Sequence, residues 1–100
     1  MIGGNTKELL TFIERCQLIT DKWYDDKGYP RCEKFSFIVG KRYIKLVFDG
    51  RAAHCFVNRE NGDVFKAASW STPAKHARGN IFDGDNGLGM MEAHGPKYLR

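Results

Sequence analysis

Residues 43–57 read YIKLVFDGRAAHCFV, and this stretch decides the fold. Two runs that are rich in β-branched and aromatic residues flank the pair Asp49-Gly50, which is a strong signal for a β-hairpin. A two-residue turn at this pair sets Ile44 opposite Cys55. Because side chains alternate between the two sides of a strand, the apolar residues of both runs fall on one face. The stretch predicts two antiparallel strands that share a single buried face.

A second hairpin is predicted one strand earlier, with Gly40-Lys41 as its two-residue turn. This turn sets Phe37 opposite Ile44, and it therefore buries the same side of the shared strand as the first hairpin does. A slip of one residue in either hairpin would move every side chain to the other face, so the agreement supports both turns.

A third turn signal is the pair Asn61-Gly62. A strict two-residue loop there would set Lys66 opposite Val57, so we expect a longer loop or a bulge. Residues 34–67 are thus predicted to form an antiparallel meander of three or four strands.

Residues 6–27 carry the pattern of an amphipathic helix, because apolar residues recur at steps of three and four. Asn5 is the expected N-cap, with Glu8 in the capping-box position three residues later. Gly28 and Pro30 are expected to end the helix. This helix should cover the buried face of the meander, which makes all 100 residues a single α+β domain.

A short second helix is predicted after the meander. Ser71 or Thr72 can cap it, and Pro73 would occupy its first position. Gly79 would end it after roughly two turns. The rest of the chain, residues 83–100, is rich in glycine and is expected to form an irregular tail.

The start of that short helix is a candidate anion site. The first turn of a helix presents unpaired N–H groups and a partial positive charge. Ser71 and Thr72 add hydroxyl groups, while Lys75 and Arg78 would share one helix face. A phosphate or a carboxylate would fit this arrangement, and the alternative is an ordinary solvated helix start.

The face of the meander that lies away from the first helix is a candidate nucleic-acid surface. In the predicted register Tyr43 lies opposite Phe56, and Lys45 lies opposite His54. Bases stack on aromatic rings while Lys and Arg neutralise phosphates, so this mixture suits single-stranded nucleic acid. The alternative is that the last segment of the chain folds over this face, which would turn Tyr43 and Phe56 into a second small core.

Positive charge is concentrated in the part of the chain that is predicted to form the sheet. The net charge is +4, and residues 27–59 alone carry +6. Such a patch attracts nucleic acid or an acidic protein, and the alternative is a solvated edge that prevents aggregation. No apolar run approaches the roughly 20 residues that span a bilayer, and the N-terminus lacks the layout of a signal peptide. We expect a soluble intracellular protein with no membrane partner.

Neither the cysteines nor the histidines show the spacing of a metal or catalytic site. Cys16, Cys32 and Cys55 are not paired in short motifs and are expected to be reduced thiols of the core. The three histidines are also far apart. We predict no catalytic residue, no metal and no cofactor, because a small hydrolase or nuclease would need a carboxylate or histidine cluster that the sequence does not show.

Two known families resemble parts of this chain. The order of helix, strands and helix is similar to that of double-stranded-RNA-binding domains, whose second helix also begins with a phosphate-gripping Lys, as PAKHAR would at residues 73–78. Residues 42–82 are more closely similar to small uncharacterised proteins of tailed bacteriophages, in the segments RYIK, HCFV, GDVFKAASW and PAKHARGN. The second resemblance implies a viral origin and action in the cytoplasm of an infected bacterium, and it lends no catalytic residue.

We therefore expect a non-enzymatic phage protein that binds nucleic acid through the outer sheet face and the start of the short helix. The alternative is a phage protein that binds and modulates a host protein through the same face. The residues expected to contact nucleic acid or another anion are Arg42, Tyr43, Lys45, His54, Phe56, Trp70, Ser71, Thr72, Lys75 and Arg78.

Overall fold

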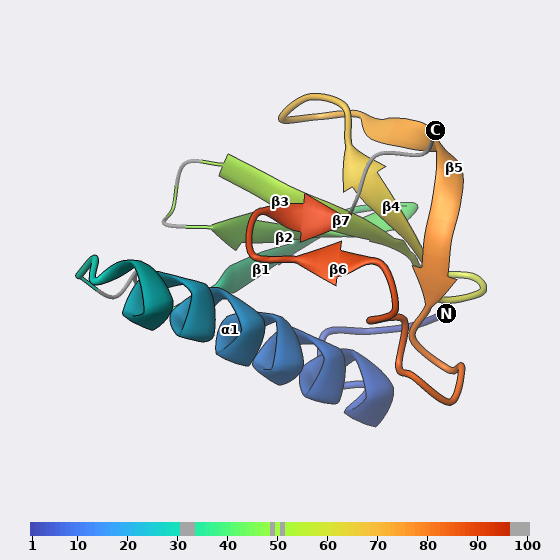
Figure 1. Cartoon of the computed structure of the whole chain (residues 1–100). Helices are drawn as coiled ribbons and strands as arrows, with labels where there is room; N and C mark the ends of the chain where they lie inside the picture. Colours follow the sequence, from blue (N-terminus) through green and yellow to red (C-terminus); the bar gives the residue numbers. More distant parts are fainter. Residues whose placement is uncertain (31–33, 49, 51, 97–100) are drawn as a thin grey trace.

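The computed structural model describes residues 1–30, 34–48, 50 and 52–96. The elements are α1 (Lys7–Lys27), β1 (Ser36–Val39), β2 (Tyr43–Phe48), β3 (Ala52–Asn58), β4 (Asp63–Ala67), β5 (Pro73–Asn80), β6 (Met91–Glu92) and β7 (Gly95–Pro96). Within the described residues, five strands build one antiparallel sheet in the order β1-β2-β3-β4-β5, and β6 pairs with β7 (Figure 1). The predicted α+β class is confirmed, and the meander has five strands instead of three or four.

The helix α1 has the predicted extent but a different cap. Its N-cap is Thr6, whose hydroxyl accepts a hydrogen bond of 3.1 Å from the Gly3 N–H outside the helix. The predicted capping box of Asn5 and Glu8 is therefore wrong. At the other end, Gly28 adopts a left-handed conformation with φ of 72° and stops the helix as predicted.

The hairpin of β1 and β2 turns one residue later than the sequence predicts. The Gly40 N–H donates a hydrogen bond of 2.9 Å to the Tyr43 carbonyl, so the two residues between them form the turn. Phe37 consequently lies opposite Leu46 and not opposite Ile44. This register differs from the predicted one by two residues, which leaves every side chain on its predicted face.

The strand β3 carries an extra residue that the sequence pattern does not reveal. Leu46 pairs with Cys55 while the next residue, Val47, pairs with Ala53, which leaves His54 as the unpaired residue of a β-bulge. His54 therefore turns toward the helix side of the sheet and is only 2 % exposed. Its predicted position on the outer face is wrong, because the bulge takes this one residue out of the alternation.

The two later connections of the meander join β2 to β3 and β3 to β4. Residues 49–51 separate β2 from β3, and Asp49 of the predicted turn lies outside the described residues. Residues 59–62 separate β3 from β4, and Val57 pairs with Val64. The longer loop expected at the third turn is confirmed.

Residues 73–80 form the strand β5 and not the predicted short helix, so the described part of the chain contains no second helix. The N–H groups of Ala68 and Ser69 both donate to the Thr72 carbonyl, at 2.9 and 3.1 Å, and close a tight turn after β4. A helix of two turns is marginal on its own, whereas pairing with β4 satisfies the main chain along the outer edge of β4. The helix start that was expected to bind an anion does not exist.

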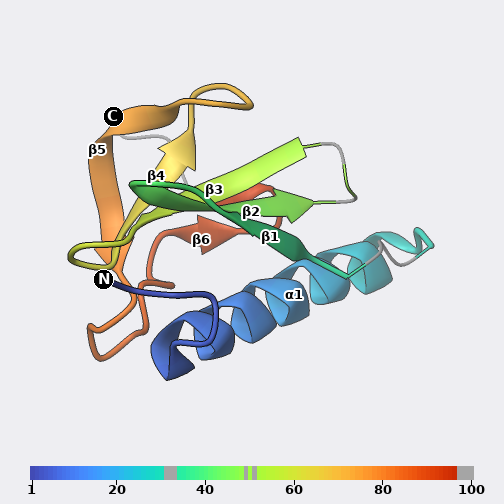
Figure 2. The same cartoon turned by 180° about the vertical axis from the view of Figure 1, so that it is seen from behind.

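The glycine-rich stretch is a run of turns that docks onto the inner face of the sheet. The Thr20 hydroxyl of α1 donates a hydrogen bond of 2.8 Å to the Ala93 carbonyl, and Ile81 is buried in the core. β6 lies beside α1 while β7 lies beside β3 and β4, so this small sheet and α1 cover the inner face together (Figures 1 and 2). The described end of the chain therefore covers the inner face and not the outer face. Residues 97–100 of the predicted tail lie outside the described residues.

The core lies between that inner face, α1 and the β6–β7 segment. Its side chains come from every layer, and burying each large one stabilises the fold by about 1.5–3 kcal/mol. The largest fully buried apolar side chains include Leu9, Phe12, Ile44, Leu46, Val57, Val64 and Ile81.

Candidate functional site

The outer face of the sheet, on the side away from α1, carries a small aromatic cluster. The rings of Phe56 and Phe65 lie edge-on to Tyr43, with centroids 6.0 and 5.9 Å from its own. Lys45 is the residue that pairs with Phe56, but Tyr43 reaches that ring along the diagonal of the two strands. Phe56 is only 4 % exposed, whereas Tyr43 is half-buried. Phe56 thus forms the floor of the cluster, and Tyr43 keeps part of its ring at the surface.

Lys45 is held on this face by the turn between β4 and β5. Its Nζ donates a hydrogen bond of 2.9 Å to the Trp70 carbonyl and lies 3.6 Å from the centroid of the Trp70 ring. In the part of the chain that the structure describes, no carboxylate forms an ion pair with Lys45. Its positive charge is therefore fixed in place without being neutralised.

A hollow of about 310 Å³ opens between these groups, and we call it the basic hollow. The described residues of its lining include three cations and no carboxylate. Two of these cations, Lys41 and Arg42, come from the turn between β1 and β2 and are exposed. Among the described residues, none forms a hydrogen bond or an ion pair with either side chain, so an anion could contact both cations directly. The lining consists of Ile38, Gly40, Lys41, Arg42, Tyr43, Lys45, Phe56 and Ser71.

Six of the predicted site residues gather at the basic hollow. Trp70 belongs to it through its contact with Lys45. The predicted set of site residues does not include Ile38, Gly40 or Lys41, because the sequence pattern indicates Gly40 and Lys41 only as the two central residues of the turn and Ile38 is neither aromatic nor basic. The predicted residues that line the hollow are Arg42, Tyr43, Lys45, Phe56 and Ser71.

The other predicted site residues lie elsewhere. Thr72 is exposed, and its carbonyl closes the turn after β4. Lys75 and Arg78 lie on the strand β5, and neither of them lines the basic hollow. His54 lies on the inner face, on the far side of the sheet.

His54 belongs to a buried cluster beneath the β6–β7 segment. Its ring centroid lies 4.7 Å from that of Phe35, and its Nδ1 lies 3.4 Å from the Cys55 Sγ. Burial lowers the pKa of His54 to about 4, and the nearby positive charges of His94 and Lys66 act in the same direction. His54 is therefore neutral at physiological pH and packs as part of the core.

The described cysteines are also buried. Burial raises the pKa of the Cys16 thiol and of the Cys55 thiol, so both are protonated and unreactive. Cys32 lies outside the described residues. Among the residues that can be described, no group of His, Cys, Asp and Glu side chains is arranged to hold a metal ion. No described helix is both long enough and apolar enough to span a bilayer.

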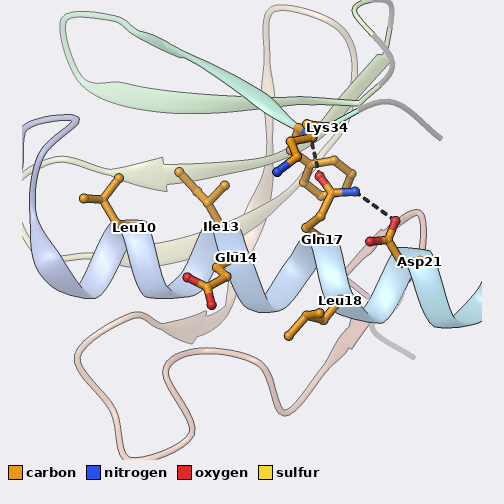
Figure 3. A pocket seen from close by; sticks show the side chains of 8 residues that line it. Leu10, Ile13, Glu14, Gln17, Leu18, Asp21 and Lys34 are labelled. Carbon is orange, nitrogen blue, oxygen red and sulfur yellow. Dashed lines mark hydrogen bonds between the residues drawn. The ribbon is translucent and has the colours of Figure 1, made fainter. Parts of the chain in front are cut away.

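A larger hollow of about 650 Å³ lies between α1 and the start of β1, and we call it the helix groove (Figure 3). Gln17 crosses it: its Oε1 accepts a hydrogen bond of 2.6 Å from the Phe35 N–H, and its Nε2 donates one of 3.0 Å to Asp21. The carboxylates of Glu14 and Asp21 disfavour a phosphate there, so the basic hollow is the better candidate for an anionic ligand. The helix groove is lined by Leu10, Ile13, Glu14, Gln17, Leu18, Asp21, Lys34 and Phe35.

Comparison with known proteins finds one family over most of this chain. The match is to "Family of unknown function (DUF7717)" and covers residues 7–95, from the start of α1 to β7. It extends well beyond residues 42–82, on which the resemblance to bacteriophage proteins rests, and it carries no statement of a viral origin. No curated protein and no solved structure matches this chain.

Proposed function

The chain belongs to the DUF7717 family of unknown function, and we propose that it binds single-stranded nucleic acid at the basic hollow. The observation that carries this proposal is that exposed cations and an accessible ring line one hollow, whose described residues include no carboxylate. Lys41 and Arg42 would contact phosphates, while the exposed part of Tyr43 would stack on a base. Lys45, already held by Trp70, would add a third positive charge at a fixed position.

The size of the hollow favours a single strand over a duplex. A volume of about 310 Å³ lies at the lower end of ligand-binding pockets and suits one base with its sugar. A base can reach the Tyr43 ring only when it is free of duplex stacking, whereas a duplex offers phosphates and groove edges. We therefore expect tighter binding to single-stranded than to double-stranded oligonucleotides.

The test is a fluorescence anisotropy titration of a labelled single-stranded oligonucleotide at several salt concentrations. Three phosphate contacts should give a slope of about −2 for the logarithm of the binding constant against the logarithm of salt, at about −0.7 per contact. The double variant Lys41→Glu with Arg42→Glu should abolish binding. Tyr43→Leu should weaken it by about 1–3 kcal/mol, because one stacked ring is lost.

The matched control for Lys41→Glu or Arg42→Glu alone is Lys7→Glu, which makes the same charge change as either single substitution at an exposed position of α1. This variant should bind nearly as well as the unchanged protein, since Lys7 belongs to α1, which covers the other face of the sheet, and does not line the basic hollow. The proposal is contradicted if Lys7→Glu lowers affinity as much as Arg42→Glu does, or if binding does not respond to salt.

The second candidate function is binding to a host protein through the same face. It is favoured by the exposed apolar residues Phe37, Ile38 and Val39 of β1. A bacteriophage origin would place the partner in the cytoplasm of an infected bacterium. A pull-down from bacterial lysate, with and without nuclease treatment, separates the candidates: a protein retained after nuclease supports this one, and loss of every partner supports nucleic acid. Neither candidate assigns a catalytic residue.

A further inference from the structure

The strand β1 forms one edge of the sheet and leaves part of its main chain facing outward. The hydrogen bond between Gly40 and Tyr43 sets the alternation of the β1–β2 ladder, so Ile38 directs its N–H and carbonyl toward β2. Phe37 and Val39 then direct theirs away from the sheet. Among the described residues, none forms a hydrogen bond with these outward groups, and every residue of β1 is exposed.

Gln17 marks where this free edge ends. The Phe35 N–H faces outward like those of Phe37 and Val39, but it donates to the Gln17 Oε1 at 2.6 Å. Asp21 accepts a hydrogen bond from the same Gln17 side chain and holds it in place. Figure 3 shows Gln17 projecting from α1 toward the residues that precede β1. The outward groups of Phe37 and Val39 are thus the ones open to a further strand.

We propose that β1 pairs with β1 of a second copy of this chain, antiparallel and around a twofold axis. In the register that uses every open group, Phe37 of each copy lies opposite Val39 of the other, and Ile38 lies opposite Ile38. The pairing contains two hydrogen-bonded residue pairs, each of which exchanges two hydrogen bonds. A register shifted by two residues would need the Phe35 N–H, which Gln17 already holds, or would reach into the turn.

The charges around the edge fit a second copy. In the same register the exposed Lys41 of one copy comes toward Phe35 of the other, beside the helix groove, whose lining carries two carboxylates, Glu14 and Asp21, against the single cation Lys34. The contact occurs twice because of the symmetry. An unrelated extended peptide would gain the same main-chain hydrogen bonds. Nothing would require it to place a cation beside the helix groove, as Lys41 of a second copy does.

The apolar surface beside the edge also fits. Leu10 is 45 % exposed and Leu18 is 61 % exposed on the wall of the helix groove, and Ile38 on β1 is 50 % exposed. The twofold axis puts both copies of α1 on one face of the joined sheet, where these leucines can be covered. β1 itself, SFIV, has no Lys, Pro or bulge of the kind that protects a free edge from pairing.

The test is the mass of the nucleic-acid-free protein in solution, measured by size-exclusion chromatography with light scattering over a range of concentrations. The unchanged protein should reach twice its 11.4 kDa chain mass as concentration rises. Ile38→Lys and Ile38→Glu should each weaken association about tenfold or more, because like charges would face each other across the axis. An equimolar mixture of the two variants should restore the dimer.

Two further variants guard against misfolding. Val39→Pro removes an outward N–H without removing a hydrogen bond between β1 and β2, and it should also give a monomer. Phe82→Lys places the same charge on another exposed apolar residue, 51 % exposed, and should leave the dimer intact. Circular dichroism melting checks that each variant is folded.

A protein that stays monomeric at its highest attainable concentration overturns the proposal. So does an Ile38→Lys variant that dimerises as tightly as the unchanged protein, and so does a mixture of the Lys and Glu variants that fails to pair. The inference does not rest on nucleic-acid binding, because the mass is measured in its absence.

Discussion

The Nζ of Lys45 lies 3.6 Å from the centroid of the Trp70 ring and donates a hydrogen bond of 2.9 Å to the Trp70 carbonyl. The two residues come from β2 and from the turn between β4 and β5, which are not neighbours in the sheet. A cation over an exposed aromatic ring stabilises a fold by about 0.5–1 kcal/mol. The contact therefore fixes the turn across the outer face and sets one wall of the basic hollow.

The first prediction is that Lys45 and Trp70 are energetically coupled. Lys45→Met keeps the apolar stem and removes the charge, while Trp70→Leu removes the ring. Each should lower the free energy of unfolding, and the double variant should lose less than the sum of the two by about 0.5–1 kcal/mol. Urea unfolding measures all four proteins. Strictly additive losses would show that the contact contributes nothing in solution.

The second prediction concerns acid stability and follows from the burial of His54. Its pKa is lowered from 6.5 to about 4 in the folded protein. The unfolded chain binds a proton at His54 more tightly than the folded protein does. The folded state therefore keeps its full stability above pH 6.5 and loses part of it as the pH falls toward 4. The loss should amount to roughly 3 kcal/mol, which urea unfolding at a series of pH values would measure.

Two histidine variants separate this effect from general acid denaturation. His54→Gln should lower stability at neutral pH and remove most of the dependence between pH 6.5 and 4. His76→Gln, at an exposed position of β5, should retain the full dependence. A flat profile in the unchanged protein would mean that folding does not lower the pKa of His54, and an equally steep profile in His54→Gln would mean that another group titrates.

The faces of the meander could be predicted from the sequence, whereas its register could not. Alternation tells which side chains share a face, and a shift of two residues leaves that pattern unchanged. Phe37 thus lies opposite Leu46 instead of Ile44, yet both partners belong to the buried side. The position of Tyr43 on the outer face follows from alternation alone. Tyr43 pairs with Asn58 and not with Phe56 as predicted, and its ring still lies 6.0 Å from that of Phe56 along the diagonal.

Features that depend on tertiary contacts could not be read from local pattern. The bulge at His54 appears only when the rest of β3 is aligned with β2. Residues 73–80 have the capping signal of a helix, but the open edge of β4 is what decides their conformation. The docking of the β6–β7 segment depends on single buried hydrogen bonds, such as that between Thr20 and Ala93, which leave no periodic signal.

The third prediction is that Gly95 cannot be replaced. Its φ is +124°, and a Cβ there would lie 2.5 Å from the His54 carbonyl oxygen. Gly95→Ala should therefore lower the free energy of unfolding by roughly 1–3 kcal/mol or more, since the main chain of β3 or β7 has to move. Gly84→Ala is the matched control, because a Cβ at that position meets nothing within 4 Å. This control should be neutral or slightly stabilising. Thermal unfolding of the two variants makes the comparison, and equal melting temperatures would contradict the packing of β7 against β3.

The fourth prediction is that the Thr20 hydroxyl holds the β6–β7 segment against α1. Thr20 is fully buried, and its hydroxyl donates the hydrogen bond of 2.8 Å to the Ala93 carbonyl. Thr20→Val keeps the shape of the side chain but leaves that carbonyl without its donor, which should cost about 1–3 kcal/mol. Hydrogen exchange followed by mass spectrometry should then show faster exchange in residues 91–96.

Thr11→Val makes the same replacement at a half-buried position of α1 and serves as the control for helix propensity. It should leave the exchange of residues 91–96 unchanged, because Thr11 lies nine residues before Thr20 in α1, about 13 Å away along the helix. If both variants accelerate exchange equally, the effect comes from weakening of the helix and not from the lost hydrogen bond. If neither does, the hydrogen bond from Thr20 to Ala93 does not hold β6 and β7 in place, since the missing donor to Ala93 is the only change that distinguishes Thr20→Val.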